Sequence, residues 1–361
     1  MEDSCSSLIS GEIIMLKKKK LKTSLNKKLI SCLCFTFLYT LLIINPTSAS
    51  DDGGDAGAFL KNGIGVRPIS MGKAFIAVAD DVHAGYWNPA GLANLTSYQL
   101  SAMYSNPMNY AFISDTGVKD IGYHTLSFAL PTGFGSLGLN MAYLSAGDIQ
   151  VVEDASGPTG ETFSNSDLGF LLSYARSATN DIQLGLNLKI LRQKVWTENG
   201  SGIGFDMGVL YAPVYNLKLG LMLQNLIEPS IQLLDDGVSN SVPRSIGLGI
   251  SYKLMEDMIL VGASIDKAGG RSAKFHMGTE VLPMNDLSLR AGYTTDTGEL
   301  TAGVGVKVSA IQIDYGFGFL DIGSTHRISL TVDLSRLMTS KGKTPETTEM
   351  STYMQAPEGD Q

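Results

Sequence analysis

The sequence lacks most of the features of a helical membrane protein or a thiol-dependent enzyme. Cysteine is absent beyond residue 34, because the three cysteines are Cys5, Cys32 and Cys34. The rest of the chain therefore has no disulfide, thiolate metal site or cysteine nucleophile. Long apolar runs are also scarce, and only Leu29–Ile44 approaches the roughly 20 residues that a membrane helix needs. A bundle of membrane helices is thereby excluded.

Histidine is rare as well, and its placement argues against catalysis and metal binding. The four histidines lie in unrelated segments without the spacing of metal ligands; they are His83, His124, His276 and His326. No Gly-x-Ser-x-Gly motif stands at a strand-to-helix turn, so no nucleophile elbow is predicted. A hydrolase whose Ser, His and Asp come from separate strands is the remaining enzyme alternative. We expect no enzyme activity, no metal and no cofactor.

Positive charge is in deficit. The chain has 27 Lys and Arg against 35 Asp and Glu, which gives a formal net charge of −8. A protein that binds nucleic acid needs the opposite balance, at least over one face, because it must neutralise phosphates. The composition therefore disfavours a nucleic-acid partner.

The first 49 residues have the features of an export signal. The basic stretch Lys17–Lys28 precedes the apolar run, and the small residues of Pro46–Ser50 follow it. This order is typical of a secretory signal peptide and its cleavage site. Residues 1–14 are atypical of such a start, whereas Met15 opens a conventional signal, so we expect translation to begin at Met15. A retained anchor helix is the alternative, disfavoured because the run is short for a bilayer.

From about Tyr98 to Leu334 the sequence is a succession of short segments in which apolar and polar residues alternate. In one of them Ile182, Leu184, Leu186, Leu188 and Ile190 alternate with Gln183, Gly185, Asn187 and Lys189. A period of two predicts β-strands with one apolar face and one polar or glycine-rich face. Turn residues divide the region into fourteen predicted strands: 98–105, 121–131, 134–145, 166–178, 181–195, 200–212, 216–226, 242–254, 257–267, 273–282, 286–293, 298–307, 310–317 and 325–334.

The number and length of these strands predict an all-β fold, a transmembrane antiparallel β-barrel. Most segments reach the roughly 9 to 11 residues that a tilted strand needs to cross a bilayer. Connections after even-numbered strands are tight, whereas those after odd-numbered strands are longer, notably 106–120, 146–165 and 227–241. Outer-membrane barrels have short periplasmic turns and longer external loops. We therefore expect an outer-membrane barrel with its tight turns in the periplasm and its long loops outside the cell.

Alternation alone does not say which face of the barrel points outward. A lipocalin-like soluble barrel would place the apolar face inside. A barrel of fourteen strands is too wide for side chains to fill as a core, and its polar face carries charges, so the lipid-facing arrangement is favoured. Outer-membrane lipids are then the partner of the apolar face.

The chain divides into four predicted parts. Residues 1–49 are the signal peptide, 50–97 an N-terminal hatch or plug, and 98–334 the barrel. Residues 335–361 form a C-terminal tail, whose polar end lacks periodicity and which we expect to be disordered.

The hatch segment is too short to be a domain, so we expect it to fill the barrel lumen. Met71, Phe75 and Val78 lie at helical spacing and predict a short helix that ends at Asp80 and Asp81. Charged hatch residues inside a barrel cost less free energy when they are paired. We expect such pairs between Arg67, Asp80 or Asp81 and charges assigned to the lumen, namely Arg192, Lys189, Arg290 and Asp314.

Residues 67–93 read RPISMGKAFIAVADDVHAGYWNPAGLA, and this motif resembles the PorV/PorQ branch of the FadL-like outer-membrane proteins. Ser324–Leu330 in the last predicted strand supports the resemblance. The hatch residues that carry it are Arg67, Pro68, Met71, Gly72, Phe75, Asp80, Asp81, Trp87, Asn88, Pro89 and Gly91. The resemblance covers the chain up to about Leu334 and implies a fourteen-stranded barrel plugged by an N-terminal hatch.

Two functions follow from the resemblance. A protein of the PorV/PorQ type would act as a docking, shuttle or accessory component of type IX-like protein secretion or surface attachment, with secreted cargo proteins as partners. A FadL-like transporter would instead carry hydrophobic small molecules, such as fatty acids or hydrocarbons, across the outer membrane. Pro131, Gly133 and Gly135 mark a candidate lateral opening for such a ligand, because a kink there would interrupt strand pairing. The hatch motif favours the secretion-linked function.

Overall fold

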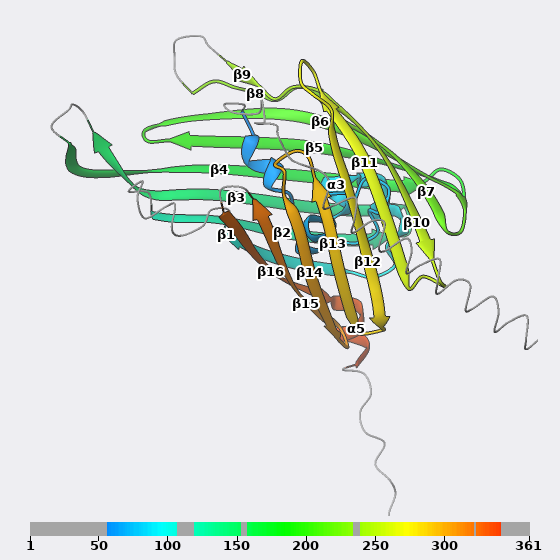
Figure 1. Cartoon of the computed structure of the whole chain (residues 1–361). Helices are drawn as coiled ribbons and strands as arrows, with labels where there is room; N and C mark the ends of the chain where they lie inside the picture. Colours follow the sequence, from blue (N-terminus) through cyan, green and yellow to red (C-terminus); the bar gives the residue numbers. More distant parts are fainter. Residues whose placement is uncertain (1–55, 107–118, 153–156, 234–238, 321–322, 341–361) are drawn as a thin grey trace, which may run out of the picture. The chain divides into compact units, whose positions relative to one another are not determined.

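The computed structural model describes residues 56–106, 119–152, 157–233, 239–320 and 323–340. Its main feature is a closed antiparallel β-barrel of fourteen strands (Figure 1). The fold class and the strand number predicted from the alternation are confirmed. Within the described ranges, helices are too short or too polar to cross a membrane. The predicted signal peptide lies outside the described residues.

Neighbouring strands pair around the whole circumference, and the first strand closes the barrel against the last. The barrel strands are β1 (Gln99–Asn106), β2 (Lys119–Thr132), β3 (Gly135–Val152), β4 (Pro158–Ser177), β5 (Ile182–Val195), β6 (Glu198–Val214), β7 (Leu217–Ile227), β10 (Ser245–Leu254), β11 (Ile259–Ala268), β12 (Lys274–Met284), β13 (Leu287–Thr294), β14 (Leu300–Val308), β15 (Ile311–Leu320) and β16 (Gly323–Asp333). Between β7 and β10, the short strands β8 (Ser230–Ile231) and β9 (Asn240–Ser241) form a separate small sheet.

The β3–β4 hairpin is longer than the sequence predicts. Its two strands pair through most of the region 146–165, which the alternation predicts to be a loop. The pairing register shifts between Ala146 and Ile149, and Asp148 there has a φ of 51°. A bulge of this kind breaks the period-two alternation. The pattern that identifies the other strands is therefore lost at this point.

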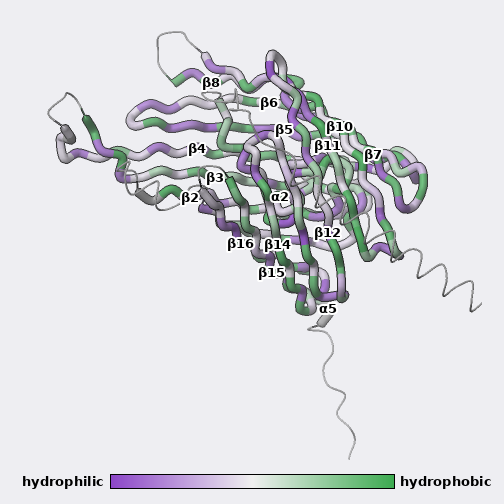
Figure 2. The backbone as a smooth tube through the Cα atoms, viewed as in Figure 1, coloured by the Kyte–Doolittle hydropathy of each residue, from purple (hydrophilic) through white to green (hydrophobic). Residues whose placement is uncertain are grey.

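The two faces of the wall have opposite polarity, and hydropathy alternates along the strands in Figure 2. On β5, Leu186 is 39% exposed and Leu188 is 42% exposed on the outer face, whereas the lumen residue Asn187 between them is fully buried. A soluble barrel would bury these leucines. The lipocalin-like alternative is therefore wrong, and the arrangement is that of an outer-membrane β-barrel.

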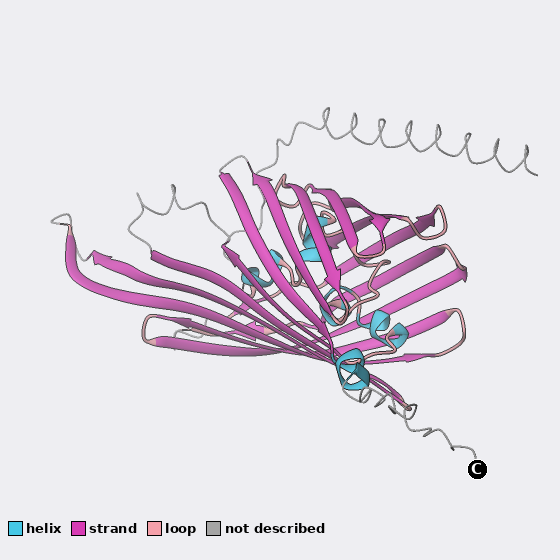
Figure 3. Ribbon diagram, turned by 90° about the horizontal axis from the view of Figure 1, so that it is seen from below, coloured by secondary structure: helices cyan, strands magenta, loops and turns pink. Residues whose placement is uncertain are grey.

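The hatch lies inside the ring of strands as a series of short helical turns (Figure 3). They are η1 (Ala58–Asn62), α2 (Val66–Ser70), α3 (Ala84–Trp87) and η2 (Pro89–Asn94). The helix predicted over Met71–Val78 is absent, because α2 ends at Ser70 and the chain then turns at Gly72 and Lys73, which have φ values of 61° and 67°. The apolar residues of that segment are buried in a cluster with other hatch residues, such as Leu92, and with wall residues, such as Leu210 and Leu260.

Glycines on the lumen face let the hatch backbone touch the wall directly. A Cβ atom added to Gly278 would lie 2.1 Å from the Met71 carbonyl oxygen, and one added to Gly292 would lie 2.1 Å from the Gly72 nitrogen. On the opposite wall, a Cβ at Gly185 would lie 2.2 Å from the Ala90 nitrogen. Since no side chain fits in these gaps, the hatch and the wall form a backbone-to-backbone contact.

The chain continues beyond the last strand as a helix, α5 (Leu334–Ser340), so residues 335–340 of the predicted disordered tail are helical. The Leu334 amide donates to the Tyr98 carbonyl at 2.8 Å, and the Tyr98 amide donates to Ser335 Oγ at 2.9 Å. These bonds attach the start of α5 to the residue before β1. The remaining tail residues, 341–361, lie outside the described residues.

Candidate functional site

Arg67 in α2 joins the hatch to the barrel wall. Its guanidinium forms two hydrogen bonds of 2.8 Å with the carboxylate of Glu280 on β12. It also lies 2.6 Å from Asp80 Oδ1 and 2.9 Å from Asp81 Oδ2, both within the hatch. Burial lowers the pKa of Arg67, but the three carboxylates outweigh burial and raise it well above its ordinary value. Arg67 therefore stays charged, and it is the centre of the ionic contact between hatch and wall.

The ionic contact continues along the wall behind Arg67. Arg290 Nε on β13 lies 2.6 Å from Glu280 Oε2, and Arg290 Nη1 lies 2.6 Å from Asp314 Oδ1 on β15. The side chains of these three wall residues are almost completely buried. β12, β13 and β15 thus supply charges of alternating sign, and one network of ion pairs joins Arg67 of the hatch to the wall.

Part of the predicted pairing is wrong. Asp80 and Asp81 pair with Arg67 of the hatch itself, and not with wall cations. Arg192 lies on the outer face of β5, since alternate residues of a strand point to the same side and Leu188 also points outward. Its side chain is exposed. Lys189 does face the lumen, but it pairs with Asp206 on β6 at 3.0 Å. The sequence analysis did not single out Glu280, the wall carboxylate that pairs with Arg67, although Glu280 lies among the polar, lumen-facing positions of its strand.

Asp81 also takes part in a second contact between hatch and wall, in which His83 links it to Ser101 on β1. His83 Nδ1 lies 3.1 Å from Asp81 Oδ1, and His83 Nε2 lies 3.1 Å from Ser101 Oγ. Burial raises the pKa of Asp81, but His83 and Arg67 outweigh it and hold that pKa well below its usual range. The order Asp, His, Ser is that of a hydrolase triad. Ser101 is only 2% exposed and its Oγ lies 2.8 Å from Thr331 Oγ1, so a substrate carbonyl does not reach it in this conformation.

The other motif residues hold the hatch in its own fold. Trp87 Nε1 donates to the Ile64 carbonyl at 2.9 Å, and its ring packs edge-on against Phe75. Asn88 Nδ2 donates to the Ile76 carbonyl at 2.9 Å and to the Val209 carbonyl of β6 at 3.1 Å. The motif therefore specifies the internal hydrogen bonds of the hatch as well as its contact with the wall.

The remaining motif residues, Pro68, Pro89 and Gly91, lie at tight points of the hatch. The Pro68 carbonyl accepts from the Lys73 amide at 3.1 Å, which closes the turn after α2. Pro89 is the first residue of η2. A Cβ atom at Gly91 would lie 1.9 Å from the Ala79 carbonyl oxygen, so only glycine fits there.

The candidate lateral opening is a regular hairpin end. Pro131 and Thr132 end β2, Gly135 begins β3, and the pairs Pro131↔Ser136 and Thr132↔Gly135 continue the ladder to the turn. The predicted kink is absent here. A wall opening at this hairpin stays a prediction, and it would require these pairs to separate.

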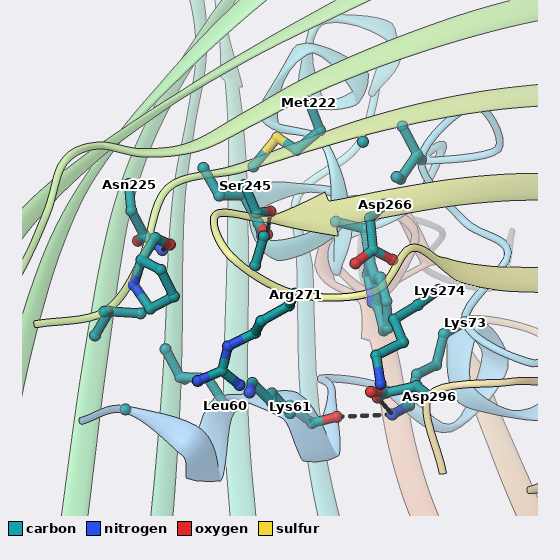
Figure 4. A pocket seen from close by; sticks show the side chains of 18 of the residues that line it. Leu60, Lys61, Lys73, Met222, Asn225, Ser245, Asp266, Arg271, Lys274 and Asp296 are labelled. Carbon is teal, nitrogen blue, oxygen red and sulfur yellow. Dashed lines mark hydrogen bonds and ion pairs between the residues drawn. The ribbon is translucent and has the colours of Figure 1, made fainter. Parts of the chain in front are cut away.

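A cavity of about 170 Å³ lies between the hatch and the wall formed by β7, β10, β11 and β12 (Figure 4). Its apolar lining includes Leu60 and Trp87 from the hatch and Met222 from β7. The polar residues of the lining also come from both the hatch and the wall. The cavity is therefore bounded by the hatch on one side, and its lining is partly apolar and partly polar. No cavity was predicted, because its residues come from several strands and from the loops between them.

An ion pair and a histidine–aspartate hydrogen bond fix the polar lining of the cavity. Lys73 Nζ lies 3.0 Å from Asp296 Oδ2 and donates to the Lys61 carbonyl at 2.9 Å (Figure 4). Burial raises the pKa of Asp296, but Lys73 outweighs it and lowers that pKa to about 2. On β12, His276 Nε2 lies 2.5 Å from Asp266 Oδ1. In the parts of the chain that the structure describes, no group of three or more His, Cys, Asp or Glu is arranged to hold a metal ion.

No family model matches the sequence, and no curated protein is similar to it. Solved structures with a similar fold include a monoaromatic hydrocarbon channel, CymD, at 12% identity and a TM-score of 0.54, which covers 76% of this chain and 97% of that chain. A deltaS2 mutant of the monoaromatic hydrocarbon channel TodX is 14% identical, with a TM-score of 0.54 and coverage of 74% and 97%. A FadL homologue of Pseudomonas aeruginosa is 13% identical, with a TM-score of 0.52 and coverage of 79% and 100%. At these identities the similarity is one of fold.

Proposed function

We propose that this chain is an outer-membrane channel for hydrophobic small molecules, closed by its N-terminal hatch. The observation that carries the proposal is the cavity between the wall and the hatch, since a ligand held there lies against the part that must move. The fold supports it, because two of the similar structures are described as hydrocarbon channels. Sites of this kind are concave and largely preformed, with an apolar lining and a few polar groups.

Transfer through this barrel requires a movement. The hatch touches the wall through backbone contacts at Gly278 and Gly292, and no side chain can rotate to clear that path. A ligand in the cavity therefore leaves either after the hatch shifts or through a break between strands. We favour a hatch shift, because the strand pairs at Pro131 and Gly135 are intact.

Docking in protein secretion is the other function that the hatch motif predicts. It rests on the motif alone, because the similar folds with TM-scores above 0.5 are described as hydrocarbon channels or as a FadL homologue. The two functions place different demands on the hatch. A docking protein binds its cargo through external loops and keeps the lumen closed, whereas a channel must open it.

A disulfide between hatch and wall tests the channel. Ser70 Oγ in α2 lies 2.8 Å from the position of a Cβ atom on Gly316 of β15, which suits a disulfide between Ser70→Cys and Gly316→Cys. Residues 50–361 contain no other cysteine. We expect oxidised cells carrying this double variant in their outer membrane to take up labelled toluene no faster than cells without the protein. Reduction should restore the uptake.

The matched control is Ser70→Cys alone, whose uptake should not respond to oxidant. Toluene uptake that stays above background in the oxidised double variant would show that the hatch does not gate the path. Uptake by the unmodified protein that equals the background would refute the channel.

A further inference from the structure

One stretch of the hatch, residues 74–78, lies between two pockets along the wall formed by β7, β10 and β11. The cavity of about 170 Å³ is the first of these pockets. The second, which we call the lower pocket, is lined by Val78 of the hatch and by Lys218 and Ser251 of the wall. It reaches Tyr215 in the tight turn between β6 and β7. Its volume of about 10 Å³ suits about one water molecule.

The order of the lining residues along the strands shows how thin the hatch is at this point. On each of the three strands, a glycine faces residues 74–78, a cavity residue lies two positions to one side of it, and a lower-pocket residue lies two positions to the other. These sets are Met222, Gly220 and Lys218 on β7, Gly247, Gly249 and Ser251 on β10, and Ser264, Gly262 and Leu260 on β11. Four residues of a strand span about 13 Å. Only this short length of wall separates the two pockets.

The three glycines let the backbone of residues 74–78 lie directly against the wall. A Cβ atom on Gly220 would lie 2.5 Å from the Ile76 carbonyl oxygen, and one on Gly249 would lie 2.8 Å from the Ala77 nitrogen. Ser251 Oγ of β10 donates to the Ala77 carbonyl at 3.1 Å. Backbone contact therefore closes the space between the two pockets, and the serine bonds the closing segment in place.

Residues 74–78 are joined to α2 and move with it. The Arg67 guanidinium of α2 lies 5.3 Å from the centre of the Phe75 ring and 2.6 Å from Asp80 Oδ1, just beyond the segment. These two contacts hold the segment and α2 together as one unit. A disulfide at Ser70 in α2 therefore restrains residues 74–78 as well.

We propose that the ligand path follows the wall of β7, β10 and β11, and that residues 74–78 are the gate between the cavity and the lower pocket. Ile76 and Met222 line the cavity before the gate. Val78 and Leu260 line the lower pocket beyond it. A neutral hydrophobic molecule thus meets apolar side chains on both sides, and it leaves at the tight-turn end without the breakage of a strand pair. The inference rests on the proposed channel function and adds its route and its gate.

A bulky label in the lower pocket tests the route. Lys253 lines this pocket, is the last lumen-facing residue of β10, and has a side chain that is 30% exposed. Residues 50–361 contain no cysteine, so Lys253→Cys can be labelled selectively with fluorescein maleimide. We expect labelling to reduce the uptake of labelled toluene by cells with this variant to that of cells without the protein.

Lys307→Cys is the matched control for the label. Lys307 is the last lumen-facing residue of β14 and is partly buried, but it does not line the lower pocket. Labelling of this variant to the same extent should leave its uptake unchanged.

The bond from Ser251 tests the gate. Ser251→Ala removes the hydrogen bond that holds Ala77 against the wall, so the open state should become more populated. We expect toluene uptake to rise about two- to tenfold, the factor that the loss of one hydrogen bond gives to an equilibrium. Ser173→Ala is the control, because Ser173 on β4 is likewise 4% exposed, and among the described residues its Oγ has no hydrogen-bond partner.

The possible outcomes separate this inference from the channel function. Uptake that survives labelling of the Lys253→Cys variant would place the path elsewhere and overturn the route, with the channel intact. An equal loss after labelling of the Lys307→Cys variant would also overturn the route. Uptake by Ser251→Ala that is no higher than that by Ser173→Ala would overturn the gate. Only an unmodified protein without toluene uptake would refute the channel itself.

Discussion

Arg67 shows how single residues hold the hatch closed. Asp80 and Asp81 pair with its guanidinium and orient it within the hatch, and Glu280 on the wall pairs with the same guanidinium. Charges removed from water are tolerated only when they are paired and hydrogen-bonded. Because every one of these carboxylates faces the same guanidinium, the loss of Arg67 affects both the hatch and the wall.

Arg67→Met should destabilise the closed state strongly. The substitution leaves Glu280, Asp80 and Asp81 without their shared cation, and removal of one partner of a buried ion pair costs about 3 to 5 kcal/mol. We expect a lower midpoint of unfolding in urea and a higher conductance in planar bilayers. Arg244→Met is the control, because Arg244 pairs with Glu228 but is 69% exposed. Conductance equal to that of the unmodified protein would show that Arg67 does not hold the hatch.

At the scale of elements, the sequence predicts the strands well and the hatch poorly. Strand ends follow from alternation and turn residues, and most lie within three residues of the predicted ends. The helix predicted over Met71–Val78 is absent, because these apolar residues are buried in a cluster shared by the hatch and the wall and do not form one face of a helix. Gly278 and Gly292 can be assigned to the lumen-facing positions from the sequence. Their contact with the hatch cannot be predicted, because it depends on which hatch segment lies opposite them.

Gly278→Ala should disturb this contact between elements. The added Cβ would lie 2.1 Å from the Met71 carbonyl oxygen, so the hatch backbone must move away from β12. Overpacking of this kind costs about 1 to 3 kcal/mol. We expect faster tryptic cleavage of the hatch, whereas the barrel should still migrate as a folded species in unheated gels.

Gly133→Ala provides the comparison, since nothing lies within 4 Å of a Cβ atom at Gly133. Cleavage at the same rate in both variants would show that the hatch does not depend on its contact with β12.

For the molecule as a whole, the barrel could be predicted and the cavity could not. Alternation specifies which side chains face the lumen: of the charges assigned there, Lys189, Arg290 and Asp314 do face it, whereas Arg192 lies on the outer face. It does not specify the height of each residue relative to the hatch, because strand register and tilt decide that height. The cavity depends on the height of its lining residues in the barrel, which the alternation does not contain. The outer surface depends only on which residues of each strand point outward, and the alternation does contain that.

That outer surface provides a test of the membrane fold. Leu186 and Ile182 both lie on the outer parity of β5, with Leu186 in the middle of an apolar band that ends before Arg192 and Ile182 at the first residue of the strand. In a bilayer, an arginine on the lipid face costs about 2 to 4 kcal/mol at the midplane and about 0 to 1 kcal/mol near the interface. Leu186→Arg should therefore lower the free energy of unfolding in lipid vesicles by that larger amount, and Ile182→Arg should change it little. For a barrel surrounded by water, both substitutions would stay within about 0.5 kcal/mol of the original protein, and urea titration of the two variants in vesicles distinguishes the cases.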